Sequence, residues 1–157
     1  MTAPDTPALQ ALAGSGLAFD VVTTERPTSV EDSAAQQGIP VSRLLKTLVV
    51  RRGPDDHIFI LVPGDRSIDW AKLRKHLGVS RISLPDADAA LAVTGYERGA
   101  ITPFGSATPL PVIADASIAE GARVAIGGGA RGVNIHALAG DLLAALGAVR
   151  ADVTKLS

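Results

Sequence analysis

The chain has no cysteine among its 157 residues. Disulfides, cysteine-ligated zinc and thiol nucleophiles are therefore excluded. The sequence also has no run of the roughly 18 apolar residues that a membrane span needs. Its first residues, MTAPDTPALQALAGSG, lack the basic and apolar regions of a signal peptide. We therefore expect a soluble cytoplasmic protein that does not interact with membranes.

Aromatic residues are also scarce, since the chain has one Trp, one Tyr and three Phe. So few aromatic rings argue against a platform on which several bases stack. The formal net charge is only −1, but residues 43–81 hold nine basic and four acidic residues. This local excess could attract a phosphate-bearing partner, or it could be a solvated helix face with strand ends.

The patterning predicts one domain over residues 1–157, of the α+β or mixed α/β class, around a curved sheet. Two apolar runs around a Gly-Pro-Asp-Asp turn predict a hairpin over residues 44–62. Helices are expected where a capping residue and a later glycine enclose a suitable segment, as Asp69 with Gly78, Asp86 with Gly95, and the capping-box pattern Thr28–Glu31 with Gly38 do. The expected helices cover 6–13, about 30–37, 70–77, 87–94 and 137–147, and the other expected strands cover 17–23, 81–84, 100–102, 110–114 and 123–126.

The usual catalytic and metal-binding motifs are missing. His57, His76 and His136 have no carboxylate at a spacing typical of catalytic or metal-binding motifs, and no HExxH or HxH pattern occurs. His136 follows Asn134 by two residues, so both side chains fall on one face if this segment is a strand. No metal and no cofactor are expected. A Ser-His-Asp triad has no support from the sequence.

Lys46 stands within the apolar segment RLLKTLVV, where a buried ammonium is costly without compensation. Two glycine-rich segments, TGYERGAITPFG (94–105) and AIGGGARG (125–132), could bring backbone N–H groups close to a ligand. Alternatively, Lys46 extends to solvent along its stem, and the glycines only serve turns. The two segments beside an embedded lysine favour a ligand pocket.

Taken together, LLKTLVV, ILVPGDRSIDWAKLRKHLG, VTGYERGAITPFG, LPVIAD and IGGGARGVNIHALAGDLL resemble the YbaK/prolyl-tRNA editing-domain family. The resemblance runs from about residue 6 to the C-terminus. It implies a mixed fold with a barrel-like sheet, and a free-standing aminoacyl-tRNA deacylase that acts in trans on mischarged tRNA. The implied substrate is tRNA for proline carrying Cys or Ala, or a related mischarged pair. The implied partners are the tRNA acceptor end and prolyl-tRNA synthetase.

The resemblance also implies a set of site residues. The embedded lysine of the family matches Lys46, which would supply a positioning charge at the terminal nucleotide or the ester carbonyl. Many members of the family have Asp where this chain has Asn134 and a second Gly where it has Ala100, and some have a Tyr near Thr23 and Thr24. The expected catalytic residues are Lys46, Gly99 and Ala100, and the expected substrate-binding residues are Thr47, Thr102, Gly128, Gly129, Arg131 and Asn134.

Two other functions remain open from the sequence. The chain could bind a tRNA acceptor end or a synthetase without hydrolysis. It could also act on a nucleotide or a small phosphate ligand, an interpretation that depends on the glycine segments alone.

Overall fold

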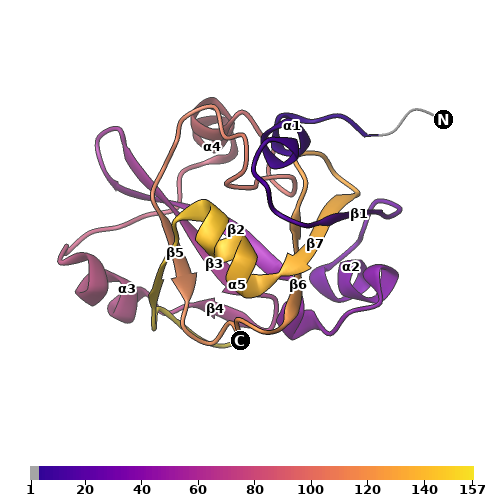
Figure 1. Cartoon of the computed structure of the whole chain (residues 1–157). Helices are drawn as coiled ribbons and strands as arrows, with labels where there is room; N and C mark the ends of the chain where they lie inside the picture. Colours follow the sequence, from indigo (N-terminus) through magenta and orange to yellow (C-terminus); the bar gives the residue numbers. More distant parts are fainter. Residues whose placement is uncertain (1–3) are drawn as a thin grey trace.

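The computed structural model describes residues 4–157, which form helices around a curved set of strands (Figure 1). Within these residues the helices are α1 (Pro7–Ala13), α2 (Val30–Gln37), the 3₁₀ helix η1 (Val41–Arg43), α3 (Trp70–Leu77), α4 (Ala87–Thr94) and α5 (Ala139–Leu146). The strands are β1 (Asp20–Thr23), β2 (Leu45–Gly53), β3 (Asp56–Pro63), β4 (Arg66–Ile68), β5 (Val112–Asp115), β6 (Arg123–Gly127), β7 (Val133–Leu138), β8 (Val149–Ala151) and β9 (Thr154–Leu156).

The strands form two larger sheets and one small pair. One sheet has the order β1-β7-β6 with antiparallel neighbours, and the other has the order β2-β3-β5-β8. In the second sheet β2 is antiparallel to β3, whereas β3-β5 and β5-β8 are parallel. A parallel bridge between Leu44 and Ala125 joins the two sheets, and β4 pairs with β9 separately. The expected mixed α+β fold around a curved sheet is confirmed.

The predicted β2-β3 hairpin is present and carries the centre of the core. β3 is buried without interruption from Ile58 to Pro63, as expected for a central strand covered on both faces. On one face a large apolar cluster includes Phe59, Leu61 and residues of α1, α5, β6 and β7. On the other face a smaller cluster packs Ile60 and Val62 against α3 and β4. In Figure 1, α2 and α3 lie at opposite sides of the molecule.

The helix boundaries agree with the predicted caps, with one shift. Asp69 and Asp86 cap α3 and α4 as predicted, and Gly38, Gly78 and Gly95 end their helices in the left-handed conformation. The cap of α2 is Ser29, whose hydroxyl accepts a hydrogen bond from the Asp32 N–H. The predicted motif began at Thr28, so it is wrong by one residue.

Several short strands were predicted wrongly. Residues 81–84 contribute only a single bridge, from Ser83 to Arg51. Residues 100–102 form no strand, because the Ala100 N–H closes a turn by donating to the Glu97 carbonyl. The last helix starts at Ala139 rather than at residue 137, because Val133–Leu138 belong to β7. The three-residue strands β4, β8 and β9 were not predicted. No helix among residues 4–157 is long and apolar enough to cross a bilayer.

Candidate functional site

A cavity of about 630 Å³ opens along the edge of β2, between the N-terminal half of α2, β6 and the segments near Leu84 and Gly99. Its volume falls within the range of roughly 300–1,000 Å³ typical of small-molecule sites. Most of its lining is apolar, with side chains such as Leu48, Ile101 and Ile126. Lys46, Thr47 and Asn134 contribute polar groups.

The cavity exists because, within the described part of the chain, no strand pairs with this side of β2 between its two bridges, at Leu44 and Arg51. The N–H and C=O of Arg51 both bond to Ser83, so they point away from β3. In an antiparallel pair the direction alternates, so the backbone groups of Thr47 and Val49 also point away from β3. These groups face the side of the strand where the cavity lies, and they are available to a ligand.

Lys46 is half-buried on β2, and its Nζ donates a hydrogen bond of 2.6 Å to the Arg66 carbonyl. Burial lowers the pKa of Lys46, while the carboxylates of Asp65 and Glu31 act in the opposite direction. The ammonium therefore lies at a partly desolvated position, oriented by one backbone oxygen, beside the cavity. Such a group can stabilise negative charge without providing a catalytic base.

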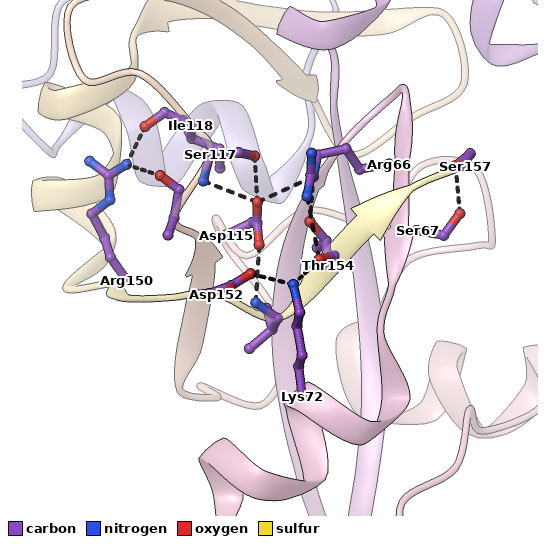
Figure 2. Close-up of polar contacts among 12 residues, drawn as sticks. Arg66, Ser67, Lys72, Asp115, Ser117, Ile118, Arg150, Asp152, Thr154 and Ser157 are labelled. Atoms are coloured by element: carbon purple, nitrogen blue, oxygen red, sulfur yellow. Dashed lines mark hydrogen bonds and ion pairs between the residues drawn. The ribbon is translucent and has the colours of Figure 1, made fainter.

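Arg66, whose carbonyl orients Lys46, is itself held by the network of hydrogen bonds and an ion pair in Figure 2. The Arg66 Nε donates to the Thr154 hydroxyl at 2.6 Å and lies 3.7 Å from a carboxylate oxygen of Asp115. Asp115 is only 1% exposed and accepts hydrogen bonds from Ser117 and from the Val153 N–H. Burial alone would raise the pKa of Asp115, but these hydrogen bonds outweigh it and lower the pKa. The network therefore fixes the turn that bonds to Lys46.

The turn around Gly99 borders the large cavity and a second one of about 330 Å³. Gly99 has φ +93°, and its N–H has no backbone partner among the described residues. Ala100 is buried and its N–H donates to the Glu97 carbonyl at 2.9 Å. Thr102 is fully buried, and its hydroxyl accepts a long bond of 3.4 Å from the Phe104 N–H. Among these predicted residues, Gly99 lines the cavities, whereas Ala100 and Thr102 lie behind it.

In and after the β6–β7 turn, too, only some of the predicted site residues line a cavity. Gly128 accepts a 2.6 Å hydrogen bond from the Thr6 hydroxyl, and a Cβ on Gly129 would lie 2.9 Å from the Tyr96 ring. Neither glycine is among the residues that line the two cavities. Arg131 lines the smaller cavity, and Asn134 lines both while its amide donates to the Val22 carbonyl at 3.1 Å.

Thr47 stands out among the polar lining residues. Its Oγ1 is inaccessible to solvent and has no hydrogen-bond partner among the described residues. A buried hydroxyl left unpaired costs roughly 1–3 kcal/mol. Thr47 lines the larger cavity, so a rotation of its side chain toward that cavity would let a bound ligand satisfy this hydroxyl.

All charged residues that line the two cavities are cationic. Lys46 and Arg98 line the larger one, and Arg26, Arg98 and Arg131 line the smaller one; among the described residues, no His, Asp or Glu lines either. His136 lies away from them, buried and bonded to Gln37, and no group of three potential metal ligands occurs within residues 4–157. Sequence reasoning missed Arg26 and Arg98, although Arg98 directly precedes Gly99 in a segment already singled out.

A model of the aminoacyl-tRNA editing domain matches residues 24–145. The proline–tRNA ligase of Geobacter sp. (strain M21) is 33% identical over 97 residues, which are 62% of this chain and 17% of that enzyme. A candidate Cys-tRNA(Pro)/Cys-tRNA(Cys) deacylase, EbsC of Enterococcus faecalis, is 25% identical over 87% of this chain and 83% of that protein. The chain thus spans less than a fifth of the ligase but most of EbsC.

A crystal structure of a candidate trans-editing enzyme for prolyl-tRNA synthetase has the same fold. It aligns with a TM-score of 0.86 over 98% of this chain and 99% of that chain, at 24% identity. The match to the domain model covers well over half of the chain and includes most of the residues that line the two cavities. The chain belongs to the aminoacyl-tRNA editing domain family.

Proposed function

We propose that the protein is a trans-editing deacylase, which hydrolyses the ester between an amino acid and the 3′ end of a mischarged tRNA. The observation that carries this proposal is the composition of the two cavities: among the residues that the structure describes, every charged lining residue is cationic, and none is an acid or a histidine. Such a site suits an anionic substrate. It also suits an ester, which is already activated and needs positioning and charge stabilisation more than a strong base.

In the proposed reaction the larger cavity holds the terminal nucleoside with its ester. Water adds to the ester carbonyl, assisted by the neighbouring ribose hydroxyl, and the ribose oxygen leaves and gains a proton. The products are the free amino acid and a tRNA with an intact 3′ end. Lys46 stabilises the negative charge that develops on the carbonyl oxygen, and the free N–H of Gly99 aligns the ester or the water.

The remaining predicted residues have supporting roles in this proposal. Thr47 and Asn134 orient the substrate through hydrogen bonds from the cavity wall. Ala100 and Thr102 fix the turn that carries Gly99, and Gly128 and Gly129 fix the turn that carries Arg131. Direct contact of the substrate with these turn residues, Ala100, Thr102, Gly128 and Gly129, stays a prediction.

For the substrate we propose tRNA for proline that carries Cys or Ala, with prolyl-tRNA synthetase as a partner that supplies it. The relatives support this choice, since they include a proline–tRNA ligase and a candidate Cys-tRNA deacylase. A small amino acid also fits a largely apolar cavity that the terminal nucleoside has to share. Discrimination by such a pocket amounts to about 1–3 kcal/mol per methylene.

The test is deacylation of a panel of aminoacyl-tRNAs by the wild-type protein. We expect Ala-tRNA(Pro) or Cys-tRNA(Pro) to be hydrolysed at least about tenfold faster than correctly charged Pro-tRNA(Pro), as one or two methylenes in an apolar pocket allow. If the protein prefers another mischarged tRNA, the deacylase proposal stands and only the proposed substrate changes. Binding of tRNA without hydrolysis of any member would overturn the deacylase proposal and select a non-catalytic acceptor-end binder.

A further inference from the structure

The smaller cavity adjoins the larger one and differs from it in charge. The two share part of their walls, including Pro27, Arg98, Gly99, Gly127 and Asn134. Whereas the larger cavity is mostly apolar, the smaller one is lined by three arginines, Arg26, Arg98 and Arg131. A ligand that enters both cavities would therefore place one part against apolar side chains and another against guanidinium groups.

These guanidinium groups are only weakly engaged by the protein. Within the described residues, Arg26 and Arg98 form no ion pair with a carboxylate. Arg98 donates a long bond of 3.4 Å to the Pro85 carbonyl. Arg131 donates one of 3.3 Å to the Arg98 carbonyl and lies 3.9 Å from the exposed Glu97 carboxylate. Since each guanidinium has five N–H donors, most of them remain available to a ligand.

Gly132 and Thr24 form another part of the lining of the smaller cavity. Gly132 has φ +77°, and a Cβ there would lie 2.7 Å from the Thr24 carbonyl oxygen, so the backbone itself forms the wall. The Thr24 Oγ1 next to it is buried and has no hydrogen-bond partner in the described part of the chain. This unpaired hydroxyl is independent of the arginines, and a rotation of the Thr24 side chain toward the cavity would let a ligand oxygen or a bridging water satisfy it.

We propose that the smaller cavity binds phosphodiester groups of a single-stranded polynucleotide end, directly before the nucleoside that occupies the larger cavity. This inference rests on the proposed function and names the part of the tRNA that this region recognises. Guanidinium groups pair with phosphate oxygens through two parallel hydrogen bonds, which a terminal nucleoside alone does not offer. Because the two cavities are lined in part by the same residues, they lie side by side, and a strand that ends in the larger one would have its preceding phosphates near the smaller one.

The inference is tested first by binding, without any hydrolysis. The probes are the trinucleotide CCA and adenosine, titrated at several salt concentrations. We expect CCA to bind more tightly than adenosine, with a logarithmic affinity that falls as salt rises. Arg98→Gln and Arg131→Gln should each weaken CCA binding about threefold to tenfold and reduce the salt slope by about 0.7–1, since each removes one phosphate contact.

The matched control is Lys75→Gln, which removes one positive charge from the exposed end of α3. Because α3 lies on the opposite side of the molecule from α2 (Figure 1), this variant should change CCA binding by less than about twofold. If an arginine variant loses as much affinity for adenosine as for CCA, the inference is overturned. Displacement of CCA by inorganic phosphate at a similar concentration would also overturn it, because it would indicate a site for free anions.

A second measurement separates this inference from the proposed function. Hydrolysis of Ala-tRNA(Pro) is compared with hydrolysis of 3′-O-alanyl-adenosine, which carries the same ester but no phosphate. We expect the arginine variants to raise KM for the tRNA at least about fivefold more than for the small ester. Equal effects on both substrates would overturn the inference while leaving the deacylase intact. Arginine-dependent CCA binding by a protein that hydrolyses nothing would support the inference and refute the deacylase.

Discussion

At the scale of single residues, the account depends on the environment of Lys46. The side chain is half-buried beside a cavity, bonds to one backbone oxygen and has Asp65 and Glu31 close enough to favour its charged form. A lysine in an apolar segment is visible in the sequence, which is why Lys46 could be predicted. Its partner could not be, because the Arg66 carbonyl lies 20 residues away and reaches Lys46 only through the β3–β4 turn.

The charge of Lys46 leads to a prediction about pH. If the ammonium is the active form, kcat/KM falls as pH rises through the Lys46 pKa, which burial lowers from the ordinary value of 10.5. Asp65→Asn removes a carboxylate that raises this pKa, so it should move the alkaline loss of activity to lower pH. The measurement is the pH profile of deacylation after subtraction of spontaneous ester hydrolysis.

Asp55→Asn is the control for this profile, because Asp55 is exposed in the turn at the other end of the β2-β3 hairpin. It should leave the alkaline limb where it is in the wild type. An identical limb in the wild type and in Asp65→Asn would contradict the role given to the Lys46 charge.

At the scale of elements, β2 is the strand that makes the site. Its hairpin with β3 followed from two apolar runs around a Gly/Pro turn, and the helix caps followed from local side-chain chemistry. The cavity did not follow from local patterns, because it lies where β2 lacks a neighbour between Leu44 and Arg51. Its walls come from residues 24–33, 44–49, 84–101 and 125–134, which only the tertiary fold brings together. Arg26 and Arg98 were missed for this reason.

The unpaired hydroxyl on β2 gives a prediction that separates stability from activity. Thr47→Val keeps the shape of the side chain and removes a buried hydroxyl that has no partner within residues 4–157. We expect unfolding free energy to stay equal or rise by about 1 kcal/mol, and kcat/KM to fall about threefold to tenfold if the hydroxyl binds substrate. Urea denaturation and steady-state deacylation measure the two effects.

The comparison is Thr94→Val, at a buried hydroxyl that donates to the Ala90 carbonyl at 2.8 Å and accepts from the Tyr96 N–H at 3.1 Å. This variant should lose about 1–3 kcal/mol of stability, because it leaves backbone groups unpaired. A similar loss of stability in Thr47→Val would mean that its hydroxyl has a partner within the folded protein.

At the scale of the whole molecule, the Asp115 network joins distant parts of the chain. Asp115 on β5 binds Ser117 and Val153, and the Arg66 side chain connects it to β4 and β9 (Figure 2). The overall α+β architecture could be predicted from the patterning of the long elements and from the family resemblance. This network could not, because its strands β4 and β9 have only three residues each and depend on long-range pairing.

The network leads to a prediction about acid stability. The folded-state pKa of Asp115 is lowered from its ordinary value of 3.8, so its stabilising effect is present above that pH and is lost as pH falls through the folded pKa. Asp115→Asn should reduce unfolding free energy at neutral pH by about 2–4 kcal/mol, because it breaks a buried, hydrogen-bonded ion pair. Its difference from the wild type should shrink below about pH 3.8.

Asp152→Asn is the matched comparison, since Asp152 pairs with Lys72 at 2.9 Å and its side chain is 69% exposed. Its effect should stay below about 1 kcal/mol, as for other surface ion pairs. Urea titrations of the three proteins across the acid range measure both values. Equal losses at Asp115 and Asp152 would show that burial does not strengthen the Asp115 network.

The central claim is that the protein deacylates mischarged tRNA with Lys46 as the essential charge. The most direct measurement is single-turnover deacylation of Ala-tRNA(Pro) and Cys-tRNA(Pro) by the wild type, Lys46→Ala and Lys75→Ala, with folding verified by circular dichroism. We predict a loss of about a hundredfold or more in Lys46→Ala and wild-type rates in Lys75→Ala. A folded Lys46→Ala protein that retains the wild-type rate would contradict the account.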